Sequence, residues 1–299
     1  DHDGSGATTF EELDPQGAVV LAEFKRWATM RWGSRFAAPL FKEIDIRNRK
    51  KLSYSDFASE CVARDFPRHK AHQVGASLDW RMVKAVQEDD VQVLEMWKPP
   101  DWLLAQANEQ AAEDFRQALL NKYGHYVRGW RQVLDKDNSN SCNWHEFCEA
   151  AKRIKFIGDV PGAWRALDAD LSGFISLKEV DEVAHAACMD FKLWVDEEFG
   201  GIRQAFRAMD TDNSNQVSFC EFRSACRSFG YKGDVSALFE SLDQHGNKHV
   251  LQYEEVCFLD SWDTLDEQVK AFTEAEMKAI IGADDAAAES RRQQARQGE

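Results

Sequence analysis

The chain contains an internal repeat, and this repeat restricts it to folds assembled from copies of one small unit. Residues 135–160 align with residues 210–235: both contain Asp-x-Asp-Asn-Ser-Asn, then Glu-Phe, then Gly-Asp-Val. The same spacing of 75 residues relates segment 164–168 to segment 239–243. Within each copy, a second polar loop begins 33 residues after the first. The repeating unit therefore consists of two similar elements.

A longer period is superimposed on the first. Residues 1–14 match residues 168–181 at a spacing of 167, and residues 89–97 resemble residues 254–262. We interpret the chain as two copies of a four-element module, of which the first lacks its opening element. Because the sequence begins at Asp1 without an initiator Met, we expect its N-terminus to be a cut made in a longer protein.

Apolar residues recur at helical spacing before and after the polar loops, which predicts an all-α chain of helix–loop–helix units. Before three of the loops they are Val160, Trp164, Leu167, Ile202, Phe206, Met209, Val235, Phe239 and Leu242. The predicted regions are a truncated module at 1–97, a helical connector at 98–126, a four-element module at 127–262, and a C-terminal helix with a polar tail at 263–299.

Four of the polar loops alternate oxygen-bearing residues in a pattern that suits calcium. Calcium is a hard cation with six to eight oxygen ligands, which a twelve-residue loop supplies from positions 1, 3, 5, 7, 9 and 12. Position 7 contributes its backbone carbonyl, and position 12 a bidentate carboxylate, which favours calcium over octahedral Mg²⁺. Position 6 needs a positive φ, which suits Gly and is tolerated by Asn. The predicted ligands are Asp1, Asp3, Ser5, Ala7, Thr9 and Glu12; Asp135, Asp137, Ser139, Ser141, Asn143 and Glu146; Asp168, Asp170, Ser172, Phe174, Ser176 and Glu179; and Asp210, Asp212, Ser214, Gln216, Ser218 and Glu221.

With these four loops, the sequence resembles the EF-hand calcium-binding family in a calmodulin-like arrangement of several hands. The resemblance covers most of the chain. It implies tandem paired EF-hands whose loops meet in short two-stranded β contacts at position 8. The implied contacts are Cys142 with Ile175, and Val217 with Val250.

Two further loops carry cations where the pattern needs ligands, and we expect no metal there because a cation repels calcium. Loop 45–56 has Arg47, Arg49 and Lys50 at two ligand positions and the turn. Loop 79–90 has Arg81, Val83 and Lys84 at positions 3, 5 and 6.

A third departure is the loop 243–254. It keeps Asp243, Asn247 and Glu254, but has His245 at position 3, Lys248 at position 6 and Leu251 at position 9. We expect weak calcium binding at best, and a role as the packing partner of the Asp210 loop. His245 and His249 are four residues apart, but no third ligand is evident, so a surface role is favoured over a transition-metal site.

Composition excludes other classes of function. A net charge of −15 argues against electrostatic attachment to nucleic acid or to an anionic membrane surface. The sequence has no apolar run of membrane-spanning length. The seven cysteines are an odd number without a Cys-x-x-Cys pair, as in a cytoplasmic or other intracellular protein rather than a disulfide framework. We find no phosphate-binding glycine loop and no catalytic constellation, so we expect no enzyme activity.

These features lead to one main hypothesis and several alternatives. The main hypothesis is a calcium sensor, or the calcium-sensing region of a larger protein, that rearranges its helices and engages a protein partner. One alternative is a structural scaffold stapled by calcium, and another is the regulatory region of a larger channel or enzyme. A further alternative is that the Asp-rich loops are solvated turns without a metal-binding role, since Asp, Asn, Ser and Gly are common in turns.

Overall fold

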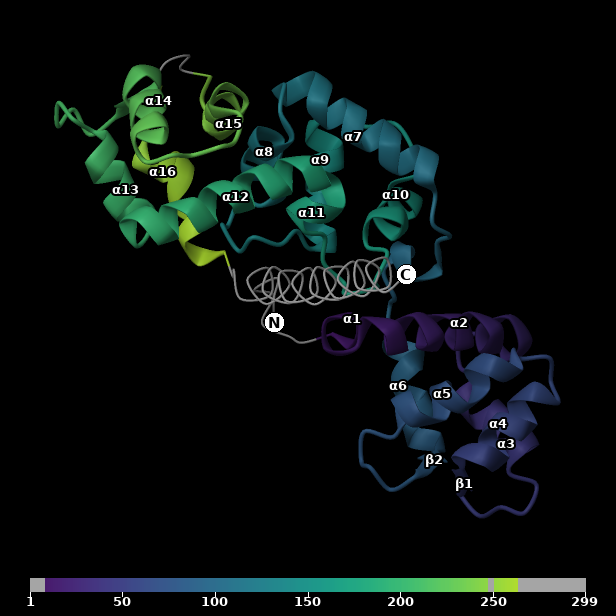
Figure 1. Ribbon diagram of the computed structural model, residues 1–299. Coiled ribbons are helices and arrows are strands. Elements are labelled where there is room, and N and C mark those ends of the chain that lie inside the picture. The colour runs from purple at the N-terminus through teal and green to yellow at the C-terminus, as the bar shows by residue number, and fades with distance from the viewer. Residues whose placement is uncertain (1–8, 247–249, 263–299) are drawn as a thin grey trace, which may run out of the picture. The chain divides into compact units, whose positions relative to one another are not determined.

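The structure is a computed structural model that describes residues 9–246 and 250–262. In these residues the chain is mainly α-helical, with two small two-stranded antiparallel sheets (Figure 1). The predicted all-α class with short strand contacts between loops is therefore confirmed. Contacts divide the chain into two compact units, residues 1–184 and 185–299. This division falls inside the predicted module 127–262, and the region boundaries drawn from the sequence stay predictions.

The first loop pair lies in the N-terminal part of the chain. Its two strands are antiparallel and place Leu52 opposite Val86. Both residues stand at position 8 of their loops, so the Asp79 loop has the same helix–loop–helix frame as the Asp45 loop. The elements are α3 (Ala37–Ile44), β1 (Lys51–Ser53), α4 (Tyr54–Val62), α5 (Arg68–Leu78), β2 (Ala85–Gln87) and α6 (Glu88–Met96).

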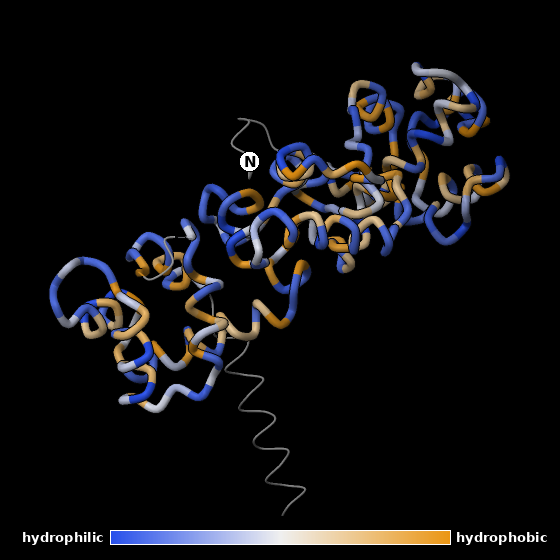
Figure 2. Tube along the Cα trace, turned by 90° about the horizontal axis from the view of Figure 1, so that it is seen from above, coloured by the Kyte–Doolittle hydropathy of each residue, from blue (hydrophilic) through white to orange (hydrophobic). Residues whose placement is uncertain are grey.

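An aromatic core holds this pair against the long helix α2 (Pro15–Trp32). The ring of Phe24 lies 5.8 Å from that of Phe57 and 5.5 Å from that of Phe66, and all three are buried. Burying one such side chain contributes about 1.5–3 kcal/mol. Hydrophobic segments alternate with hydrophilic ones along the helices, as expected for amphipathic elements around a core (Figure 2).

The second loop pair has a single bridge in place of a sheet. Cys142 and Ile175 exchange two backbone hydrogen bonds of 2.8 and 2.9 Å, which confirms the predicted contact. In the predicted connector, Phe115 stacks on Phe147 with ring centroids 4.4 Å apart. The elements of this part are η1 (Asp101–Leu104), α7 (Glu109–Tyr123), α8 (Tyr126–Gly129), the π-helical turn η2 (Trp130–Leu134), α9 (Trp144–Arg153), α10 (Val160–Leu167) and α11 (Leu177–Val180).

The third loop pair lies in the second unit, and its register corrects a prediction. Val217 lies opposite Leu251, and Ser218 opposite Val250, so the predicted contact of Val217 with Val250 is wrong by one residue. The elements are α12 (Glu182–Phe199), which begins before the division, α13 (Ile202–Met209), β3 (Val217–Ser218), α14 (Phe219–Ser228), α15 (Val235–Leu242), β4 (Val250–Leu251), α16 (Tyr253–Val256) and η3 (Cys257–Ser261). The predicted C-terminal helix at 263–299 lies outside the described residues.

The longer sequence period is also visible as structure. A short helix α1 (Phe10–Leu13) followed by α2 corresponds to α11 followed by α12, at the spacing of 167. Between the two helices of each copy, Asp14 or Asp181 accepts a hydrogen bond from the backbone of the next helix. Trp27 and Trp194, also 167 apart, each donate the indole N–H to a backbone carbonyl, at 3.2 and 3.1 Å. The two copies therefore share their local contacts as well as their sequence.

Candidate metal centres

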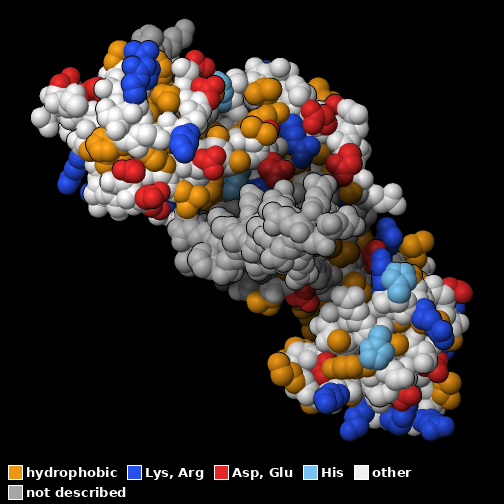
Figure 3. All heavy atoms as spheres, viewed as in Figure 1, with side chains coloured by type: hydrophobic (Ala, Val, Ile, Leu, Met, Phe, Trp, Pro, Cys, Tyr) orange, Lys and Arg blue, Asp and Glu red, His pale blue; other side chains and the backbone are white. Residues whose placement is uncertain are grey.

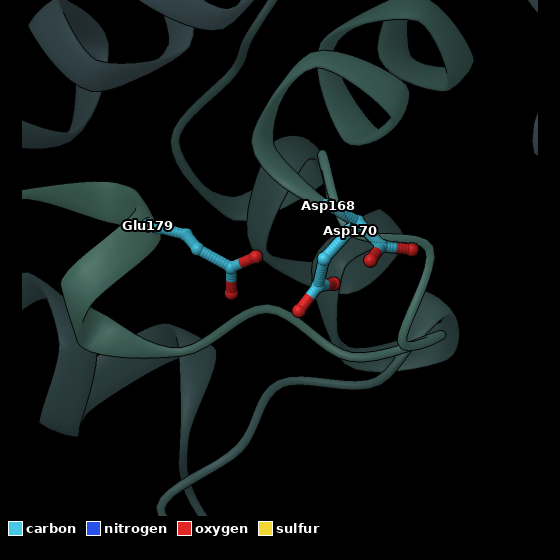
Figure 4. A group of neighbouring side chains, drawn as sticks. All are labelled: Asp168, Asp170 and Glu179. Atoms are coloured by element: carbon cyan, nitrogen blue, oxygen red, sulfur yellow. The ribbon is translucent and has the colours of Figure 1, made fainter.

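The Asp168 loop brings three carboxylates together. Asp168 ends helix α10, Asp170 follows it, and Glu179 stands in the first turn of α11. One oxygen from each carboxylate lies within 4.8 Å of the others. Glu179 reaches toward the two aspartates from the opposite side of the loop (Figure 4). Three hard oxygen donors at this separation fit a calcium ion.

The backbone of this loop holds Asp168 in place. The amides of Ser172 and Gly173 donate to the two oxygens of Asp168, at 2.8 and 3.2 Å. Gly173 has φ of 82°, the left-handed conformation predicted at position 6. The Ser172 hydroxyl donates to the Phe174 carbonyl at 2.9 Å, so the oxygens of positions 5 and 7 lie side by side. The loop therefore gathers further oxygen ligands beside the three carboxylates.

The Asp210 loop repeats this arrangement. Asp210, Asp212 and Glu221 form the second group of three carboxylates with oxygens within 4.8 Å of one another. The amides of Ser214 and Asn215 each donate to Asp210 at 2.9 Å. Asn215 takes φ of 61°, which confirms that Asn serves at the turn position. The Asp168 and Asp210 loops are hereafter called the open loops.

The Asp135 loop differs, because its first ligand already has a cation. Arg131 forms an ion pair with Asp135, and the Trp130 indole donates to the same carboxylate at 3.1 Å. The π-helical turn η2 precedes Asp135 and carries both donors. Asp135, Asp137 and Glu146 are not among the groups of three carboxylates within 4.8 Å in the described residues. We find here a competitor for calcium that the spacing of ligands did not reveal.

The Asp1 loop is only partly described. Asp1, Asp3, Ser5 and Ala7 lie outside the described residues, as does the side chain of Glu12. The helix α1 that follows begins at Phe10, as α11 begins at Leu177 in the matching copy. The predicted ligands of this loop therefore stay a prediction.

The Asp45 and Asp79 loops keep the same backbone but hold a cation of their own; they are hereafter called the cation-filled loops. The amides of Arg49 and Lys50 donate to Asp45 at 3.0 and 2.6 Å, as the amides of positions 5 and 6 do in the open loops. Arg49 pairs with Asp56 at 3.1 Å. In the second loop Arg81 pairs with Asp90 at 2.6 Å. Asp56 and Asp90 stand at position 12, so a guanidinium pairs with the carboxylate that would bind calcium in an open loop.

The Asp243 loop is one residue longer than predicted. Glu255, and not Glu254, is buried and caps the following helix through Gln252, as Glu221 does through Ser218 in the open loop. The loop therefore ends at position 13, which explains the shift of the strand register. His245 lies 2.9 Å from a Glu255 oxygen, so this loop also places its own side chain against the acid. Sequence reasoning missed Glu255 as the acid that closes this loop.

Burial and hydrogen bonding set the charges of the open loops differently. Burial raises the pKa of Asp168 to about 6 and also raises the pKa of Glu179. Hydrogen bonds from Ser218 instead lower the pKa of Glu221 to about 2, and Thr211 adds to this effect. A cation between these carboxylates would relieve the cost of crowding and burying them.

Comparison with known families agrees with this geometry. Residues 199–259 match the family model of the EF-hand domain pair, and the match spans the Asp210 and Asp243 loops. This region is therefore an EF-hand domain pair. EF-hand domains bind calcium ions through such loops.

No curated protein matches the chain. In the described residues no helix is long and apolar enough to cross a membrane.

Proposed function

We propose that the chain is a calcium sensor whose two open loops bind calcium. The observation that carries this proposal is the convergence of one carboxylate from each of positions 1, 3 and 12 in both loops. With three carboxylates per loop and Ser at position 5, we expect dissociation constants on the order of 10⁻⁶–10⁻⁵ M, the range of sensors.

We treat the Asp135 loop and the Asp1 loop separately from the open loops. Calcium at the Asp135 loop has to displace Arg131, which lies against Asp135, so its affinity is weaker than that of the open loops. We retain the Asp1 loop as a further site on its sequence alone. The cation-filled loops take no calcium.

The sensor role rests on where the position 12 acids lie. Glu179 and Glu221 stand in the first turn of α11 and α14, so an ion that draws these carboxylates inward also moves the helices. In the third pair a hollow of only about 20 Å³ is lined wholly by apolar side chains. They include Phe191, Ile202, Phe206, Met209 and Phe222. We propose that calcium widens this hollow into a groove for a partner helix.

A structural scaffold is the second candidate. It is supported by the ion pairs of Arg49 with Asp56 and of Arg81 with Asp90, which hold the first pair together without calcium. In this alternative calcium stabilises the other loop pairs and causes no change of conformation. The regulatory region of a larger channel or enzyme stays a third alternative.

We further propose an intracellular, non-enzymatic protein. All seven cysteines are free, and four of them are buried. Burial raises the pKa of the Cys61, Cys142 and Cys188 thiols, which disfavours the reactive thiolate. Free, unreactive thiols suit a reducing compartment.

Two titrations test the proposal. Calorimetry with millimolar Mg²⁺ present should lose one calcium equivalent in Glu179→Gln and another in Glu221→Gln, with at least about 100-fold weaker binding at each altered site. Glu254→Gln is the matched control, because this acid lies outside the corrected ligand position. Unchanged stoichiometry in both variants would sink the ligand assignment.

A hydrophobic dye then separates sensor from scaffold. A saturable rise of dye fluorescence with micromolar calcium is the result expected for a sensor. A flat dye signal alongside calorimetric binding contradicts the sensor role and supports the scaffold.

A further inference from the structure

The cation-filled loops expose large apolar side chains at their tips. Ile46 is 79% exposed, Trp80 72% and Met82 89%. Ile46 follows the first residue of one loop, while Trp80 and Met82 belong to the other, and the strands β1 and β2 pair these loops at one end of the first module. Three large apolar side chains exposed on two paired loops are candidates for an interaction surface.

Exposed cations surround these side chains. Arg47, Lys50, Lys51 and Lys84 lie on the same two loops, and their side chains make no ion pair among the described residues. Figure 3 shows Lys and Arg gathered at the edge of the module formed by these loops. We call this set, together with Ile46, Trp80 and Met82, the loop-tip patch.

Four acids of the two loops already have partners within their own loops. Asp56 and Asp90 are paired with arginines, and Asp45 and Asp79 accept backbone amides. The exposed acids nearby are Glu88 and Asp89, which begin helix α6. They share with Lys42 and Lys50 the lining of a hollow of about 600 Å³. A ligand that carries both an anionic group and an ammonium group would meet side chains of the opposite charge for each group there.

The overall charge of −15 does not extend to this part of the chain. Residues 9–97 contain 14 acidic and 14 basic side chains, so the excess negative charge lies elsewhere in the sequence. Charges farther away than about 8 Å are largely screened at physiological salt. The charge argument against a membrane surface therefore holds for the whole chain and not for the loop-tip patch.

The patch is held in shape without a metal. Arg81 lies over the Trp80 ring, 5.1 Å from its centroid, while its other contact is with Asp90. The amides of Val83 and Lys84 donate to Asp79 at 3.0 and 2.6 Å. A surface already ordered before binding loses less conformational entropy on binding.

We propose that the loop-tip patch docks the chain on an anionic phospholipid surface, independently of calcium. Trp80, Met82 and Ile46 would enter the boundary between headgroups and acyl chains, where aromatic and apolar side chains are stable. The flanking lysines and Arg47 would lie at the depth of the phosphates. A fluid surface is favoured over a protein partner because the apolar side chains stand on projecting loop tips, while the adjacent hollow is lined largely by charged and polar groups.

Co-sedimentation of the full chain with vesicles in chelator tests this proposal. We expect binding to phosphatidylcholine vesicles that contain phosphatidylserine, and none to phosphatidylcholine alone. Lys50→Gln/Lys51→Gln should weaken binding about 10- to 30-fold, given about 1 kcal/mol for each cation near the surface. Trp80→Ser/Met82→Ser should weaken it by at least about tenfold.

Matched variants elsewhere serve as controls. Ile157 is 99% exposed, so Ile157→Ser removes an apolar side chain outside the patch. Lys152→Gln/Lys232→Gln removes two exposed cations. Both controls should bind vesicles as the unaltered chain does.

Three results would overturn the proposal. The first is no binding to anionic vesicles, which would leave the patch to an acidic protein partner. The second is binding that weakens equally in patch and control variants. The third is binding that appears only with calcium, which would assign it to the open loops.

Discussion

The open loops and the cation-filled loops share one backbone conformation but differ in the cation that their acidic side chains face. In the Asp45, Asp79, Asp168 and Asp210 loops alike, position 1 accepts amides from positions 5 and 6 at 2.6–3.2 Å. All four also take positive φ at positions 4 and 6, even where those residues are Met82 and Lys84. The comparison shows that the loop shape does not depend on its ligands.

What differs is the cation that faces position 12. In the open loops Glu179 and Glu221 face two aspartates, and a cation has to come from solution. In the cation-filled loops an arginine of the same loop supplies it. The Asp135 loop lies between these cases, because its arginine comes from the preceding helical turn. An internal charge thus lies where the proposed function places the ion, while the backbone of the loop is kept.

The largest effect on stability is expected where the internal cation is most buried. The Arg131 and Asp135 side chains are 3% and 0% exposed. Arg131→Met leaves a buried carboxylate without its cation, and should lower the free energy of unfolding in chelator by about 3–5 kcal/mol. Calcium should recover part of this loss, because the ion can then occupy the vacated position.

Chemical denaturation with and without calcium measures both effects. Lys136→Met is the control, since the ion pair of Lys136 with Glu149 is partly exposed and contributes little to stability. Equal stability of Arg131→Met and the unaltered chain in chelator would show that Arg131 does not compensate Asp135.

A smaller loss is expected in the cation-filled loops, and it should differ between them. Asp90 is 1% exposed and Arg81 31%, so Arg81→Ala should cost about 2–3 kcal/mol, less than breaking a fully buried pair. Arg49 and Asp56 are 44% and 48% exposed, so Arg49→Ala should cost less than about 1 kcal/mol. Denaturation midpoints measure both, and a larger loss in Arg49→Ala would reverse the proposed order.

A further effect, on calcium affinity and not on stability, should distinguish the open loops from each other by its pH dependence. Calcium binding requires Asp168 to be ionised, and burial raises its pKa to about 6. Between about pH 7.5 and pH 5 the affinity of this loop should therefore fall about tenfold. Glu221, with a pKa lowered to about 2, keeps its charge throughout this range.

Calorimetry on Glu221→Gln leaves the Asp168 loop as the one intact open loop, and on Glu179→Gln the Asp210 loop. In chelator the sign reverses: because the folded pKa of Asp168 is raised, the contribution of this group to the stability of the calcium-free protein increases as pH falls from about 6 toward 4. An Asp168 loop with pH-independent affinity would contradict the assignment of a proton to this site.

Much of this architecture is predictable from sequence, because the repeat and the loops are local features. Helical spacing correctly places Trp164, Leu167 and Met209 in the core, and the position 8 rule correctly pairs Cys142 with Ile175. The ligand pattern does not show which cation reaches a loop from outside it. Arg131 reaches Asp135 through a π-helical turn, which has no signature in the spacing of apolar residues.

The predicted strand register of the Asp243 loop was wrong for a different reason. A fixed loop length of twelve selects Glu254, whereas the structure places Glu255 at the helix cap. The longer repeat carried the signal, because residues 89–97 aligned with 254–262 set Glu255 opposite Asp90. Comparing copies was more informative here than applying a motif to one copy.

The most direct test of the central claim follows four backbone amides by NMR during a calcium titration. Gly173 and Asn215 donate at position 6 to the first ligand of the open loops, and Lys50 and Lys84 do so in the cation-filled loops. Calcium should polarise the carboxylates of the open loops, so the Gly173 and Asn215 amide resonances should move while those of Lys50 and Lys84 stay fixed. Movement of all four, or of Lys50 and Lys84 alone, would contradict the claim that an internal cation replaces the ion.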